Sequence, residues 1–208
     1  MKNNYFLFSR YFRLIALLLL LLHPLFYFFI QASETSGILR AEKVNPTTVD
    51  VLFTNNQRMS IDFYGDNIFR IFQDNSGGII RDPEAKPEAR ILVDQPRRKV
   101  SVLVLDDKND RVILTTGKVR IELEKQTSLM KVFNLETNVC VIEQAAPVIF
   151  SPKEVTVTLK ENPGEYFYGG GVQNGRFSHK GKVIAIENQN SWTDGGVASP
   201  TPFYWSTK

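Results

Sequence analysis

The chain has 208 residues, of which 43% are hydrophobic and 23% are charged, and its formal net charge is +3. This length is enough to bury one sizeable core. Three basic residues, Lys2, Arg10 and Arg13, lie in the first 33 positions without any acid, and the remainder carries 22 basic and 22 acidic residues. Because a nucleic-acid-binding face needs clustered basic residues, we expect no nucleic-acid partner. Cys140 is the only cysteine, which excludes an intrachain disulfide.

The amino end has the layout of an export signal. An uncharged stretch from Leu14 to Ala32 follows the basic residues, and the small residues Ala32 and Ser33 precede the first acid, Glu34. We predict a signal peptide over residues 1–33 and an exported domain, periplasmic or extracellular, over residues 34–208. The stretch is also long enough to cross a bilayer, so a retained signal anchor, the only membrane contact we expect, is the alternative.

The chain after the leader is a succession of short stretches rich in Val, Ile and Phe. Most of them alternate apolar with polar residues, as half-buried β-strands do. Clusters of Gly, Asn, Asp and Pro at positions 65–67, 106–110 and 162–164 separate them and favour tight turns. The predicted strands are Val49–Phe53, Met59–Tyr64, Ile68–Gln73, Lys99–Leu105, Arg111–Thr115, Lys118–Glu124, Met130–Leu135, Val139–Glu143 and Val155–Leu159.

These strands predict an all-β fold, an antiparallel β-sandwich, because each half-buried sheet must cover its apolar face with a second layer. Val119, Ile121 and Leu123 alternate with charged residues and should therefore face the core. The loop over residues 76–90, which is rich in Gly and Pro, should mark where the chain crosses between the two sheets. Apolar residues at helical spacing are missing after the leader, so we expect few helices.

The sequence offers little for catalysis by a thiol, a metal ion or a bound phosphate. Cys140 lies in an apolar run typical of a buried, inert thiol, and His179 is the only histidine after the leader. A zinc site needs three or four well-placed ligands, so no metal site is predicted. Lys180-Gly181-Lys182 lacks the hydroxyl residue of a phosphate-binding loop. We therefore expect no cofactor.

The run from Tyr166 to Trp205 is the most informative part of the chain. It gathers glycines and aromatic residues without helical or alternating periodicity, which is typical of a binding loop. Gly169–Gly171 follow an aromatic strand over Glu165–Tyr168 and indicate a bulge or a tight turn. We interpret His179 as a hydrogen-bonded structural residue rather than a catalytic base.

Trp192, Thr193 and Asp194, which are followed by two glycines, are candidate sugar-binding residues. A carboxylate accepts hydrogen bonds from sugar hydroxyls, and an aromatic ring packs against the weakly apolar face of a sugar. The structural alternative is that Trp192 packs into the sandwich while Asp194 caps a turn.

Two segments of this run, YFYGGGVQNGRFSHKGK and NSWTDGGVASPTPFYWSTK, resemble the end of the amino-terminal sandwich of glycoside hydrolase family 31, the alpha-glucosidase and alpha-xylosidase family. The resemblance extends from about Glu165 to Lys208. It implies a galactose-mutarotase-like sandwich that precedes a (β/α)8 catalytic barrel, in a retaining hydrolase acting on alpha-linked oligosaccharides. Both catalytic carboxylates of such an enzyme lie on the barrel, so we expect no catalytic residue in this chain.

The resemblance also implies a role for the tryptophan-containing loop. In relatives, a loop of this sandwich reaches over the mouth of the barrel and contributes a carboxylate to the substrate pocket. By position that carboxylate is Asp194, and Trp192 would line the same pocket. The better-known alpha-glucosidases have an arginine before that aspartate, where this chain has Thr193, and this difference leaves the fine choice of substrate open.

The chain ends at Lys208, directly after the apolar residues Phe203, Tyr204 and Trp205 and without a closing turn. We therefore expect a longer protein, in which a barrel of about 250 residues comes next, and we expect the fragment alone to be inactive. Two alternatives stay open. One is a non-catalytic surface sandwich that binds glycans or a partner, and the other is a transglycosylase on the same scaffold.

Overall fold

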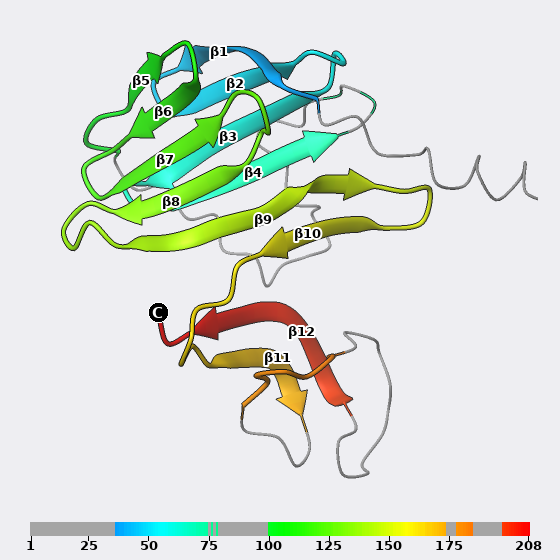
Figure 1. The fold of residues 1–208 in the computed structure, drawn as a ribbon. Coiled ribbons are helices and arrows are strands. Elements are labelled where there is room, and N and C mark those ends of the chain that lie inside the picture. The colour runs from blue at the N-terminus through cyan, green and yellow to red at the C-terminus, as the bar shows by residue number, and fades with distance from the viewer. Residues whose placement is uncertain (1–35, 75, 77, 79–99, 174–177, 185–196) are drawn as a thin grey trace, which may run out of the picture.

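The computed structural model of the chain describes residues 36–74, 76, 78, 100–173, 178–184 and 197–208. The predicted signal peptide, residues 1–33, lies outside the described residues. Every element of the described part is a β-strand, and the strands form antiparallel sheets (Figure 1). No helix in these ranges is long and apolar enough to cross a membrane. The prediction of an all-β chain with few helices is confirmed for this part of the protein.

The first sheet contains four antiparallel strands in sequence order, joined by short turns. Its strands are β1 (Ile38–Asn45), β2 (Thr48–Phe53), β3 (Arg58–Gly65) and β4 (Ile68–Asp74). In the register of β2 and β3, Val49 lies opposite Ile61 and Val51 lies opposite Met59. All four of these side chains are buried, so the two central strands supply one half of the core.

The second sheet contains six antiparallel strands in the order β10-β9-β8-β7-β6-β5. They are β5 (Val104–Asp107), β6 (Arg111–Thr115), β7 (Val119–Glu124), β8 (Met130–Asn134), β9 (Cys140–Phe150) and β10 (Val155–Leu159). β9 is the longest of them. It pairs with β8 through residues 140–143 and with β10 through residues 144–150, so its second half extends past the start of β8.

The two sheets pack face to face around one hydrophobic cluster. Phe63 and Ile61 from β3 and Leu114 and Ile121 from the second sheet are fully buried members of it. The alternation along β7 is as predicted, because Ile121 is buried while Glu122 on the other face is only partly covered. Removing a side chain of this size from water stabilises the fold by about 1.5 to 3 kcal/mol.

The chain crosses between the sheets after β4, as the loop composition predicts. β4 is an edge of the first sheet and β5 is an edge of the second, so the connection from residue 75 to residue 103 joins them. The returning chain is held to the first sheet at two points. The backbone N–H of Ser101 donates to Asp66 Oδ1 at 2.8 Å, and Lys43 Nζ donates to the carbonyl oxygen of Leu103 at 2.8 Å.

In the two sheets of the sandwich, three elements differ from the sequence-based expectation by more than one residue at a boundary. β1 is absent from the predicted strands, because only Ile38 of its eight residues is buried and the strand therefore lacks an apolar alternation. β5 begins at Val104 rather than at residue 99. β9 continues to Phe150, seven residues beyond the predicted end at Glu143, through a stretch that contains Pro147.

A third, two-stranded sheet comes after the sandwich and lies next to its β9–β10 edge (Figure 1). It consists of β11 (Phe167–Gln173) and β12 (Val197–Ser206). β11 covers the predicted aromatic strand only in part, since it starts at Phe167 and continues through the glycines.

Candidate functional site

The β11–β12 hairpin fixes both ends of the segment that carries the candidate sugar-binding residues. Gln173, the last residue of β11, pairs with Val197, the first residue of β12. The connection over residues 174–196 therefore starts and returns at one end of the hairpin. Trp192, Thr193 and Asp194 belong to this connection and lie outside the described residues. Their predicted role in sugar binding stays a prediction.

The three glycines form the bulge that the sequence predicts. Their φ angles are +116° at Gly169, +75° at Gly170 and +85° at Gly171, values that residues with a side chain rarely adopt. The pairing with β12 shifts between Gly169 and Gly171, as at a β-bulge. A Cβ at Gly169 would lie 2.7 Å from Tyr204 Cα and closer still to the carbonyl oxygen of Phe203. Only glycine fits this close approach of the two strands.

His179 holds the segment that comes after residues 174–177 against β11. Its backbone N–H donates to the carbonyl oxygen of Phe167 at 2.8 Å, and its Nε2 lies 2.8 Å from the carbonyl oxygen of Gly169. A carbonyl oxygen only accepts hydrogen bonds, so Nε2 carries the proton. The side chain is 7% exposed. These contacts confirm that His179 is a hydrogen-bonded structural residue.

Glu165 and Lys180 build the base of the hairpin, and the sequence alone points to a role for neither. The Glu165 side chain is buried, and its Oε2 accepts hydrogen bonds from the backbone N–H and from Nδ2 of Asn162, both at 3.0 Å. A hydrogen bond from the Ser206 hydroxyl is the largest cause that holds the pKa of Glu165 below its ordinary value. Lys180 Nζ donates to the backbone carbonyl of Glu165 at 2.6 Å. The bond from Ser206 ties the start of β11 to the end of β12, and the bond from Lys180 ties the segment over residues 178–184 to the same place.

The aromatic residues of the hairpin are paired across its strands and exposed to solvent. Tyr168 and Trp205 lie opposite each other and their rings stack with centroids 4.4 Å apart. The rings of Phe167 and Tyr204 are 6.4 Å apart and tilted by 56°. Phe203, Tyr204 and Trp205 are all more than half exposed, at 63%, 59% and 52%. Successive side chains of a strand point to opposite faces, so the pair with Trp205 and the pair with Tyr204 lie on different faces, and the hairpin exposes aromatic groups on both.

The sequence also raised the question of chemistry at Cys140 and at a metal site. Cys140, expected to be buried, is half-buried at the start of β9, where its Sγ donates to the carbonyl oxygen of Ile142 at 3.3 Å. Within the described ranges, no group of three or more His, Cys, Asp or Glu side chains lies close enough to hold a metal ion.

Comparison with solved structures finds the same fold in much longer enzymes. The chain is similar to a GH31 dextranase from Flavobacterium johnsoniae, with a TM-score of 0.69 at 14% identity, covering 84% of this chain and 21% of the dextranase. It is similar to a GH31 alpha-xylosidase from a soil metagenome, with a TM-score of 0.59 at 13% identity, covering 79% of this chain and 26% of that one. A cycloalternan-forming enzyme from Listeria monocytogenes gives a TM-score of 0.62 at 15% identity, covering 82% of this chain and 16% of that one.

The chain therefore spans between about a sixth and a quarter of the length of these relatives. No curated protein sequence matches it. The family model that matches is described as the glycosyl hydrolase 31 N-terminal galactose mutarotase-like domain, and it covers residues 58–208, from the start of β3 to the last residue. The chain belongs to the family of glycoside hydrolase 31 N-terminal domains, as the glycine-rich and tryptophan-containing segments indicate.

Proposed function

We propose that this sandwich is the amino-terminal domain of a retaining alpha-glycosidase that cleaves alpha-linked glucosides or xylosides. In this proposal the chain itself contributes no catalytic group. Its β11–β12 hairpin docks against a (β/α)8 catalytic domain of the same polypeptide, and the connection between the two strands reaches the substrate. Membership of the family and the dextranase and alpha-xylosidase among the similar structures support this assignment.

The observation that carries the proposal is the exposed aromatic surface of the hairpin. A two-stranded hairpin is marginally stable on its own in water, and several large aromatic side chains exposed on one small element favour an interaction that covers them. Tyr166, Phe203, Tyr204 and Trp205 expose about half or more of their surface. A neighbouring domain that covers them would stabilise the hairpin and fix the position of the connection that it closes.

We propose that Asp194 accepts hydrogen bonds from the hydroxyls of the bound sugar and that Trp192 lines the same pocket. Both would act in substrate binding rather than in bond cleavage. The pairing of Gln173 with Val197 supports this role, because it brings both ends of the connection together at one end of the hairpin. Loops that are held by such scaffolds often carry binding residues.

Turnover tests the proposed activity directly. Purified protein in which these residues continue into the catalytic domain should release the aryl group from aryl alpha-glucosides or alpha-xylosides, with retention of anomeric configuration in the first product. The 208-residue chain alone should give no turnover. Inversion in the longer protein, or activity that stays with the purified short chain, would contradict the proposal.

Two further tests separate this proposal from its alternatives. Sequencing the DNA beyond codon 208 should reveal a barrel-sized continuation of alternating strands and helices, and an immediate stop codon would instead favour a non-catalytic glycan-binding sandwich. Product analysis with maltose or isomaltose should give monosaccharides. Longer saccharides as the main product would indicate a transglycosylase.

We also propose that the protein is exported through residues 1–33. The basic start, the long uncharged stretch and the small residues Ala32 and Ser33 support this. Amino-terminal sequencing of the secreted protein should place the new start at about Glu34. An unprocessed amino end in the membrane fraction would indicate the retained anchor, and an unprocessed soluble protein would contradict export.

A further inference from the structure

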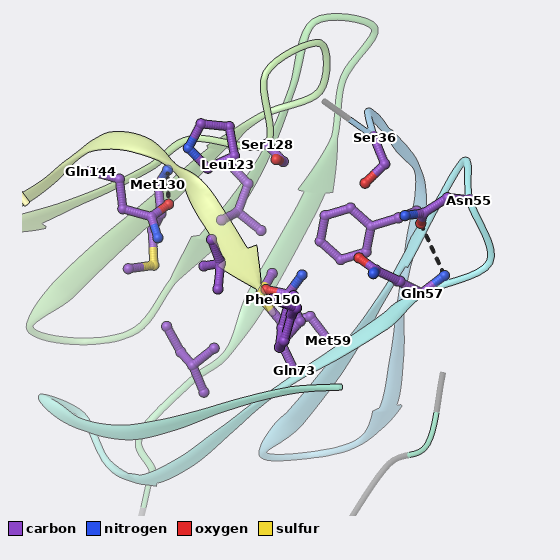
Figure 2. Close-up of a pocket in the computed structure, with 14 residues that line it drawn as sticks. Ser36, Asn55, Gln57, Met59, Gln73, Leu123, Ser128, Met130, Gln144 and Phe150 are labelled. Carbon is purple, nitrogen blue, oxygen red and sulfur yellow. Dashed lines mark hydrogen bonds between the residues drawn. The ribbon is translucent and has the colours of Figure 1, made fainter. Parts of the chain in front are cut away.

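The sandwich contains a pocket at the end where β9 extends past β8. The pocket has a volume of about 160 Å³ and is lined by residues of both sheets (Figure 2). Gln144 approaches it from one side, and Asn55 and Gln57 approach it from the other (Figure 2). None of the described residues that line this inter-sheet pocket carries a charge. It lies in the sandwich and not in the hairpin, so a ligand bound there is independent of the proposed function.

Gln144 supplies a buried polar group to the pocket. Its side chain is 7% exposed, and its Oε1 accepts a hydrogen bond from the backbone N–H of Met130 at 2.9 Å. Because a backbone N–H can only donate, the bonded atom is the amide oxygen, and the two N–H groups of the same amide remain as donors. Met130 is the first residue of β8, so Gln144 marks the point where β9 leaves that strand.

Three more side-chain amides line the opposite part of the pocket. The Oδ1 of Asn55 accepts a hydrogen bond from the backbone N–H of Gln57 at 3.1 Å, which again leaves the amide nitrogen as a donor. No hydrogen bond joins the side-chain amide of Gln57 or Gln73 to another residue of the described part. Asn55 is exposed at the rim and Gln57 and Gln73 are partly buried, so these amides stay accessible and can both donate hydrogen bonds to a ligand and accept them from it.

Apolar groups form the rest of the lining. Phe53 is 3% exposed and Phe150 is partly buried, and the side chains of Met59 and Met130 also line the pocket. An ionised ligand would lose its hydration without meeting an opposite charge, which disfavours it. A purely apolar ligand would leave the amides unpaired. The lining therefore fits a neutral molecule with hydroxyl groups at its edge and apolar C–H faces.

The volume limits the size of that molecule. An engineered protein cavity of about 150 Å³ holds one six-membered benzene ring, and the inter-sheet pocket is of similar size at about 160 Å³. Asn55 and Ile71 at its rim are exposed, so the pocket is open on that side and the hydroxyl groups of a sugar ring can extend out of it. We propose that this pocket binds one neutral pyranose ring, either a free monosaccharide or the terminal unit of an oligosaccharide. In this proposal the site holds sugar without cleaving it, since no carboxyl group is found among the lining residues that the structure describes.

Methionine methyl signals test this proposal without any substitution. The sequence contains three methionines, Met1, Met59 and Met130, and the last two line the pocket. In the protein labelled with 13C at the methionine methyls, D-glucose or D-xylose should shift the signals of Met59 and Met130 saturably, with Kd on the order of 1 mM. Unshifted pocket signals with both sugars, or an equal saturable shift with glycerol, would overturn the proposal.

A pair of variants then assigns the shift to the amides. The double variant Gln57→Leu with Gln73→Leu should bind the sugar about tenfold more weakly or worse, since two ligand hydrogen bonds are lost. Gln126→Leu is the matched control, because Gln126 is exposed in the turn after β7 and does not line the pocket. Unchanged affinity in the double variant, with the methyl spectrum of the folded protein retained, would overturn the assignment. If the double variant fails to fold, the wild-type titration alone decides.

Discussion

His179 Nε2 lies 2.8 Å from the backbone carbonyl oxygen of Gly169, so the one described histidine is bonded to the first glycine of the β11 bulge. This bond joins the segment over residues 178–184 to the hairpin. It also explains why a histidine occurs in a loop that shows no other sign of acid–base chemistry. A side chain that donates to a main-chain carbonyl in a buried setting stabilises local structure.

The stability of His179 variants should depend on whether the new side chain keeps a hydrogen-bond donor at the position of Nε2. His179→Ala removes the donor and should lower the free energy of opening the hairpin by about 1 to 2 kcal/mol. His179→Gln should retain more stability than His179→Asn, because the glutamine amide nitrogen reaches about as far as Nε2. Hydrogen exchange of the β11 and β12 amides measures this. Equal exchange rates in all three variants and the wild type would show that the bond contributes nothing.

Gly169→Ala should destabilise the hairpin by at least about 3 kcal/mol, because it adds both backbone strain and a steric clash. The new Cβ would lie 2.7 Å from Tyr204 Cα. Gly181→Ala is the matched control, since Gly181 also has a positive φ, +63°, but has open space around its Cβ position. We expect a cost of about 1 kcal/mol there. Hydrogen exchange that ranks the two variants in the opposite order would contradict the geometry of the bulge.

Ile121→Ala should destabilise the sandwich by about 2 to 5 kcal/mol, because it leaves a cavity at a fully buried position. The side chain has 0% exposure. Val157→Ala on the edge strand β10 is the control, because Val157 is 55% exposed and its truncation should change stability by no more than about 0.5 kcal/mol. Urea denaturation gives both values, and a small effect at Ile121 would place the core elsewhere.

The stability of the hairpin should decrease as the pH falls, because the stabilising contribution of the Glu165 carboxylate is lost. The hydrogen bond from Ser206 is the largest cause that lowers its pKa, and the hydrogen bonds from Asn162 lower the pKa further. Burial acts in the opposite direction and raises it. The carboxylate therefore stabilises the folded state at neutral pH, and this contribution is lost as the pH falls below the ordinary glutamate value of about 4.3 and through the folded pKa.

Ser206→Ala tests the origin of this pH dependence. It removes the largest cause of the shift, so the stability of the hairpin should depend less on pH between about pH 5 and pH 3 than in the wild type. Glu165→Gln should remove the contribution of this group altogether. Hydrogen exchange over that range is the measurement. A hairpin that becomes more stable on acidification, or an unchanged slope in Ser206→Ala, would contradict the assigned cause.

The sequence could predict the strands that bury one face and expose the other. The alternation in β7 leads to nearly correct bounds, because its period of two reflects burial directly. The bounds of β10 are predicted correctly although all five of its residues are exposed, so there β-propensity rather than burial gives the signal. β1 could not be found in this way, since it is an edge strand with one buried residue out of eight. The extension of β9 contains Pro147, and β12 contains Pro200 and Pro202, and proline argues against a strand in a local pattern.

In the candidate sites too, features that depend on local sequence could be predicted, and contacts between residues far apart in the chain could not. The glycine bulge and the structural histidine could be predicted, because local sequence determines the backbone shape at glycines. The base of the hairpin could not, since Glu165 and Ser206 are far apart in the chain and meet only when β11 pairs with β12. The inter-sheet pocket combines Asn55 with Gln144, and no local motif connects residues that are brought together by sheet packing.

The proposed role of this domain is to lend a sugar-binding carboxylate to a catalytic domain, and Asp194→Ala in the longer enzyme tests that role most directly. We predict that kcat/KM falls by an amount equal to about 1 to 3 kcal/mol of transition-state binding, while Tm stays nearly unchanged. Asp106→Ala is the control, because this exposed β5 aspartate forms an ion pair with Lys108 alone, at 3.2 Å, within the described part of the chain, and it should leave both values as they are. Unaltered kcat/KM in Asp194→Ala would contradict the proposed role.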